Sequence, residues 1–155
     1  MSSTDHIADA HNELWNAAEE SVSKRYVPEK YQLGILTDFL DKTGAEYESE
    51  VKIVSYPIDI VALRGESIIT IEMKSRNVSR GIEQARRNSD FVDFSFLALW
   101  ESDITDGILE RAHELPIGLL AVGESVKIVS FPTKTEKQLY PRSDVLRIVN
   151  ENVRK

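Results

Sequence analysis

The chain has 155 residues, 41% hydrophobic and 29% charged, which predicts one compact domain with a real core and argues against a multidomain protein. It has no cysteine, which excludes disulfides and thiolate metal sites and is typical of the cytoplasm. The net charge of −7 argues against a generally basic nucleic-acid coat, and no stretch approaches the ~20 apolar residues that would span a membrane.

Apolar periodicity divides the chain into helical and strand-like segments. In chain order we expect a helix over 4–25, a helix over 29–44, strands over 45–55, 57–64 and 67–74, a helix over 78–92, a strand over 93–100, a helix over 104–115, a hairpin over 117–132 and a helix over 143–155. This order predicts an α/β fold around a central mixed sheet. The expected domain bounds are 1–27 for the N-terminal helix, 28–132 for the core, and 133–155 for a linker and the C-terminal helix.

Residues 74–87 carry five basic residues and one acidic residue, a local charge of +4 that leaves −11 on the rest of the chain. A polyanionic partner would therefore meet this segment. In the predicted helix, Arg80, Gln84 and Arg87 lie opposite the apolar stripe, and Arg76 precedes them. A basic, amide-bearing face of this kind suits contact with a phosphate backbone.

A tight hairpin is predicted around Gly65-Glu66, because Gly at the first turn position gives access to positive φ. In the resulting register Asp59 falls opposite Glu72. Period-two alternation places Glu72 and Lys74 on one face of their strand. The side chains that point to the other face of this strand are Ile69, Ile71 and Met73. The three charged groups therefore converge.

Two facing carboxylates repel, and partial burial would raise one pKa unless a positive charge lies between them. A divalent cation such as Mg²⁺ resolves this, since it favours oxygen ligands, commonly one or two carboxylates with waters and phosphate oxygens. The neighbouring Lys74 could then hold a scissile phosphate or orient an attacking water.

These residues resemble a known family. Pro57-Ile58-Asp59, Glu72-Met73-Lys74 and Gln84-Ala85 are similar to the pattern of the PD-(D/E)xK nuclease superfamily, which includes restriction enzymes and Holliday junction resolvases. The resemblance covers about residues 29 to 131 and implies a restriction endonuclease-like αβββαβ core. The roles it implies are metal ligands at Asp59, Glu72 and the Met73 carbonyl, charge stabilisation at Lys74, and orientation of the site at Gln84.

The pattern is incomplete in two places. Some members carry a glutamate on the first core helix, for which Glu29 is the candidate here. An aromatic residue often follows the Gln-Ala pair, whereas Asn88 stands nearby in this chain. A second Glu-x-Lys, Glu50-Val51-Lys52, lacks a preceding Pro-x-Asp, and we interpret it as a solvated strand face.

We therefore expect a metal-dependent nuclease that hydrolyses DNA phosphodiester bonds through a metal-activated water, with Mg²⁺ or Mn²⁺ as cofactor. DNA would be held by its phosphate backbone along residues 74–87. One alternative is a catalytically inactive DNA-binding or structural subunit of the same fold, and another is a protein-interaction domain that uses its terminal helices. The substrate form stays open between duplex, single-stranded or branched DNA and RNA. The small size allows a homodimer that cuts two strands.

Overall fold

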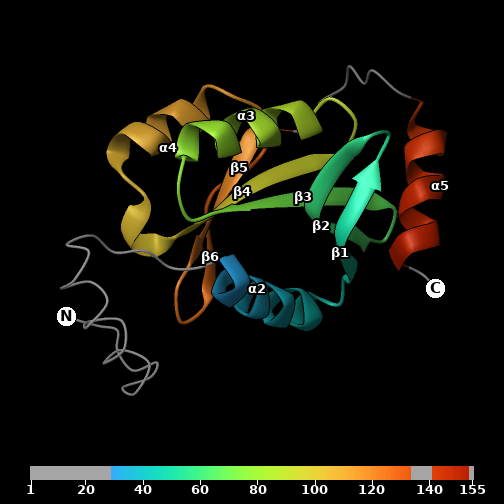
Figure 1. Cartoon of the computed structure of the whole chain (residues 1–155), viewed down its shortest axis with the longest axis horizontal. Helices are drawn as coiled ribbons and strands as arrows, with labels where there is room; N and C mark the ends of the chain where they lie inside the picture. The colour runs from blue at the N-terminus through green and yellow to red at the C-terminus, as the bar shows by residue number, and fades with distance from the viewer. Residues whose placement is uncertain (1–28, 134–140, 154–155) are drawn as a thin grey trace.

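The computed structural model describes residues 29–133 and 141–153, so the predicted helix over 4–25 lies outside the described residues (Figure 1). The described helices are α2 (Glu29–Thr43), α3 (Val78–Asn88), the short η1 (Glu101–Asp103), α4 (Asp106–His113) and α5 (Arg142–Val153). The strands are β1 (Glu46–Ile53), β2 (Tyr56–Arg64), β3 (Ser67–Lys74), β4 (Phe94–Trp100), β5 (Ile117–Val122) and β6 (Val126–Ser130).

The six strands form one sheet in the order β1-β2-β3-β4-β5-β6. The central pairs β3–β4 and β4–β5 are parallel, and the remaining pairs are antiparallel. Helices α3 and α4 make the crossover connections that parallel neighbours require. The predicted α/β fold with a mixed sheet is confirmed, and the hairpin expected over 117–132 is the antiparallel pair β5–β6.

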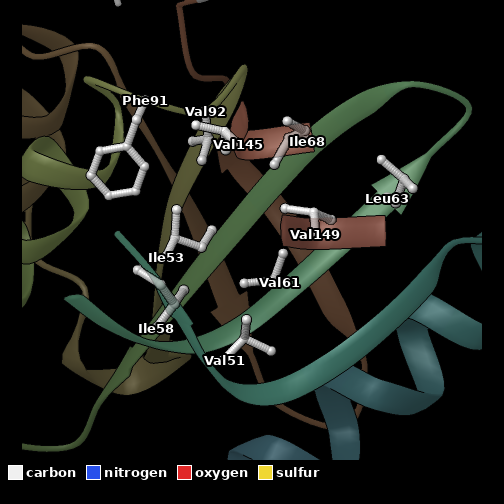
Figure 2. Close-up of a cluster of buried hydrophobic side chains, with 10 residues drawn as sticks. All are labelled: Val51, Ile53, Ile58, Val61, Leu63, Ile68, Phe91, Val92, Val145 and Val149. Atoms are coloured by element: carbon white, nitrogen blue, oxygen red, sulfur yellow. The ribbon is translucent and has the colours of Figure 1, made fainter. Parts of the chain in front are cut away.

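Helices cover both faces of the sheet (Figure 1). Helix α2 packs on one face through Leu36 and Leu40, against apolar side chains of β2 and β3. Helices α3 and α4 cover the other face over β4 and β5. Helix α5 closes the β1–β2 end, where Figure 2 shows its Val145 and Val149 among side chains of the first three strands. Helices α2 and α5 therefore bury the apolar stripes that their sequences predict.

The hairpin between β2 and β3 has the predicted register. Arg64 pairs with Ser67 across the two-residue turn, and Ile60 pairs with Ile71 farther along. Gly65 takes a left-handed conformation, with φ of 63°, which glycine adopts without steric cost. Asp59 and Glu72 are the next residues after the last regular pair, so the hairpin brings them together.

The β1–β2 ladder is interrupted beside Asp59. Its register runs regularly on both sides but omits the pair between Asp59 and Glu50, and Glu50 is left-handed with φ of 57°. Side chains change faces across this point, because Ile58 packs in the cluster beneath α5 whereas Ile60 packs beneath α2. The interruption therefore turns β2 at the residue that carries the carboxylate.

Helix α3 is shorter than the predicted helix over 78–92. It ends at Asn88, after which the backbone N–H of Ser89 closes the last turn onto Ala85 and the Ser89 hydroxyl donates to the Arg86 carbonyl. Val92 then enters the core beneath α5 instead of extending the helix. Among the described residues, no helix is both long and apolar enough to cross a membrane.

Candidate active site

Strand β2 leaves β3 at Asp59, and the side chain of Asp59 continues the ladder. By the register, Ile58 would pair with Met73, but the regular pairing ends two steps earlier, at Ile60 and Ile71. The Met73 N–H instead donates to Asp59 Oδ2 at 2.8 Å. This bond holds the Asp59 carboxylate against the end of β3, at the fork between the two strands.

The same bond shows where the Met73 carbonyl points. Within a strand, the N–H and C=O of one residue face the same neighbouring strand. Since the Met73 N–H faces Asp59, its carbonyl also faces the side that β2 has left. The carbonyl predicted as the third oxygen ligand therefore faces the same side of β3 as the Asp59 carboxylate.

Glu72 lies on the opposite face of β3 from Met73 and is 2% exposed. Its Oε2 accepts a hydrogen bond from Asn88 Nδ2 of α3 at 3.0 Å. Burial, followed by the negative charge of Asp59, raises the pKa of Glu72 to about 7, against the opposing effects of the Asn88 hydrogen bond and the Arg87 charge. The pair therefore repels at neutral pH, a condition that a bound cation would relieve.

Lys74 ends β3, and its side chain lies on Gly81 of α3. An added Cβ at Gly81 would come within 2.5 Å of Lys74 Cγ and 2.9 Å of Leu97 Cδ1. The absence of a side chain at Gly81 therefore lets α3 approach the strand and places Lys74 on the same face as Glu72. The predicted common face of these two residues is confirmed.

The predicted site residue Gln84 lies between these contacts. On α3, positions 81, 84 and 88 follow one stripe of the helix, and the first and last of them touch Lys74 and Glu72. Gln84 Oε1 is buried and has no hydrogen-bond partner among the described residues. An unpaired buried amide oxygen at this point fits a group that would face a ligand or water.

The basic residues predicted to bind nucleic acid divide into two groups. Arg76 and Arg80 are exposed around the start of α3. Arg87 is half-buried, with its guanidinium 4.3 Å above the ring centre of Tyr56. Its Nη2 donates to Asn88 Oδ1 at 3.1 Å. Arg87 is thus fixed beside the carboxylates instead of forming part of an open basic face.

Two site residues were missing from the sequence prediction. Gln32 of α2 is fully buried, and its Nε2 donates to the Lys74 carbonyl at 3.0 Å. It therefore takes the place beside β3 for which Glu29, one turn earlier, was the candidate. Asn88, seen only as a departure from the family pattern, binds Glu72. The available signal was a polar residue on an apolar helix stripe, since Gln32 precedes Leu36 and Leu40 at four-residue spacing.

The donor set suits a hard divalent cation. Within residues 29–133 and 141–153, no group of three or more His, Cys, Asp and Glu side chains could hold a metal ion. The site offers two carboxylates and a main-chain carbonyl, and Mg²⁺ typically completes such a set with waters and substrate phosphate oxygens. The residues therefore fit Mg²⁺ or Mn²⁺ and do not form a closed cage.

A pocket of about 330 Å³ lies elsewhere in the fold. It is lined by apolar side chains and includes Ser67, Ile69 and Phe94, at the starts of β3 and β4. The carboxylates lie at the opposite, carboxyl end of β3. The site is therefore an edge of the sheet and not this pocket.

No protein-family model matches the chain, and no curated protein matches it. Among solved structures, the chain is similar to the SPO1766 protein of unknown function from Silicibacter pomeroyi, with a TM-score of 0.57 and 18% sequence identity. The likeness covers 74% of this chain and 75% of that chain. At this identity it shows a shared fold alone.

Proposed function

We propose that this chain is a divalent-metal-dependent nuclease built on a restriction endonuclease-like core. One observation carries the proposal. Asp59 and Glu72 meet where β2 separates from β3, and Lys74 lies beside them at the end of β3. Burial and the neighbouring charge of Asp59 raise the pKa of Glu72, and a cation held between the two carboxylates would relieve their repulsion. A lysine beside them is arranged for an anionic substrate.

Each residue of the site would have a separate role in the hydrolysis. When bound, Mg²⁺ or Mn²⁺ supplies Lewis acidity toward a phosphodiester and a water nucleophile. Asp59, Glu72 and the Met73 carbonyl would hold the ion. Lys74, kept in place by Gly81, would neutralise negative charge that develops on the phosphate. Gln84 would orient a water that donates to its unpaired amide oxygen.

DNA would approach along α3. Arg80 and Arg76 are exposed around the amino end of this helix and would contact phosphates next to the scissile one. Arg111 of α4 extends the basic surface, since its Nη1 donates to Ser79 Oγ at 3.2 Å. The acidic remainder of the chain would limit contact to this side.

The deciding experiment is cleavage of a labelled panel of linear, supercoiled, single-stranded and four-way-junction DNA with Mg²⁺ or Mn²⁺. We expect cleavage to be abolished by chelator, by Lys74→Ala and by Asp59→Asn. Asparagine at position 59 keeps an oxygen acceptor for the Met73 N–H and removes the charge, so a loss of activity would not reflect a broken ladder. Lys52→Ala, in the other Glu-x-Lys motif, is the matched control and should cut like wild type.

Undiminished cleavage in both site variants would overturn the assignment of the site. A second candidate function is DNA binding without cleavage, favoured by the lack of a third acidic ligand among the residues that the structure describes. It requires salt-sensitive DNA binding that chelator does not change. The expected homodimer stays a prediction.

A further inference from the structure

Asn88 links the acidic pair to a basic residue. It is the last residue of α3 and has no exposed surface. Its Nδ2 donates to Glu72 Oε2 at 3.0 Å, and its Oδ1 accepts from Arg87 Nη2 at 3.1 Å. A buried amide with both ends bonded to charged side chains has one defined orientation.

The chemistry of the two partners determines which way the amide faces. A guanidinium can only donate hydrogen bonds, so the Asn88 oxygen must be the end that meets Arg87. The Asn88 amino group is then directed at Glu72, whose ionised carboxylate can only accept. Arg87 is itself held over the ring of Tyr56, which stacks on Phe91 with ring centres 6.0 Å apart. The donor that meets Glu72 is therefore oriented through Arg87, which is held in turn by Tyr56.

We propose that Asn88 is a positioning residue that fixes the Glu72 carboxylate for a divalent cation. The inference rests on the proposed function, because it assigns a ligand role to Glu72. With Oε2 bonded to Asn88, rotation of the carboxylate is restricted, so an ion held between Glu72 and Asp59 would meet a carboxylate of fixed orientation. Partners of this kind, which orient a metal ligand, typically change metal affinity by about 10–100-fold when they are removed.

The test measures Mn²⁺ binding to the full-length protein by calorimetry, without nucleic acid. Asn88→Leu keeps the branching and the number of heavy atoms of the side chain and removes the donor. Asn88→Ala opens space in which a water can bond to Glu72. Ser95→Ala is the matched control, since Ser95 is buried on the same helix interface and donates to the Ala85 carbonyl at 2.6 Å without touching Glu72.

We expect Asn88→Leu to weaken Mn²⁺ binding by about tenfold or more, Asn88→Ala to weaken it less, and Ser95→Ala to leave it unchanged. A purely structural role predicts the reverse order for the first two, because alanine leaves a cavity and leucine does not. Circular dichroism establishes that each variant is folded. If the leucine variant does not fold, the alanine variant alone tests the positioning role, and we expect it to bind Mn²⁺ several-fold more weakly than wild type.

Three results would overturn the inference in different ways. Wild-type affinity in a folded Asn88→Leu or Asn88→Ala variant would remove the positioning role and leave the metal site intact. Absence of Mn²⁺ binding to the wild-type protein, with Glu72→Gln unchanged from it, would remove the proposed metal site and the inference with it. Equal weakening by Ser95→Ala would show that only the packing of α3 matters.

Discussion

Replacing Glu72 with Gln should stabilise the protein at pH 8 and have little effect at pH 5. Glutamine has the same shape, its oxygen can still accept from Asn88, and its amino group can donate to Asp59. The substitution therefore removes the charge of Glu72 and keeps the hydrogen bonds of the site. The stability difference between variant and wild type reports the cost of ionising Glu72 inside the fold.

The magnitude follows from the pKa. Burial and the charge of Asp59 raise the pKa of Glu72 from 4.5 to about 7 in the folded protein. Between these values the folded chain binds more protons at this group than the unfolded chain does, so wild-type stability falls as pH rises through the window. The full cost, about 3 kcal/mol, is reached only above pH 7 and is absent below pH 4.5. For a chain of this size, that corresponds to roughly 6–12 °C in Tm.

The assay is urea unfolding of wild type and Glu72→Gln from pH 5 to pH 8, in the presence of chelator. Glu50→Gln, in the exposed second Glu-x-Lys motif, is the control, and its stability difference from wild type should not grow with pH. Adding Mg²⁺ at 100 times its Kd should stabilise wild type at pH 8 by about 2.7 kcal/mol and Glu72→Gln much less. A Glu72→Gln difference that is flat with pH, or that favours wild type at pH 8, would refute the reasoning.

Three further substitutions test other parts of the structure. Arg142→Ala should lower the free energy of unfolding by about 2 kcal/mol, because Arg142 bonds the buried Asp93. Arg147→Ala, the control in an exposed ion pair, should lower it by under about 0.5 kcal/mol. Equal effects of the two substitutions in urea unfolding would contradict this prediction. Val54→Asn should raise the free energy of unfolding by about 1 kcal/mol, since the Val54 backbone is left-handed with φ of 65° and asparagine tolerates this conformation better. A lower free energy of unfolding in the variant would show that valine is not strained there. Arg80→Gln should weaken DNA binding evenly across sequences and reduce the salt slope by about 1, measured by fluorescence anisotropy; an unchanged slope would place the phosphate contact elsewhere.

The register at the site could be predicted because it depends on neighbouring residues. A two-residue turn with Gly65 at its first position leaves one pairing for the strands on either side. Alternation then separates Glu72 from the core residues on the other face. The meeting of Asp59 with Glu72 therefore required no knowledge of the rest of the fold. The αβββαβ order was readable for the same reason, because each segment has a clear apolar period.

The bend of the β1–β2 hairpin could not be predicted from local preference. Glu50 and Val54 both adopt positive φ, although a β-branched residue such as valine disfavours it and the turn at 54–55 contains no Gly or Asn. Packing of α5 on the strands overrides these preferences. Ile58 is buried beneath α5, and this requires the strand to change faces beside Asp59. The helix that imposes the bend is more than 80 residues away in the sequence.

Buried amides are the sequence feature that could have located the site more fully. Burying an amide without partners costs free energy, so a Gln or Asn on the core-facing stripe of a helix indicates a polar group opposite it. Gln32 comes from the helix on one face of the sheet, and Gln84 and Asn88 come from the helix on the other. Gln32 and Asn88 bond directly to the end of β3, where β2 has turned away and backbone and carboxylate groups need partners. Amides that converge from both faces on one strand end therefore mark that end as the candidate site.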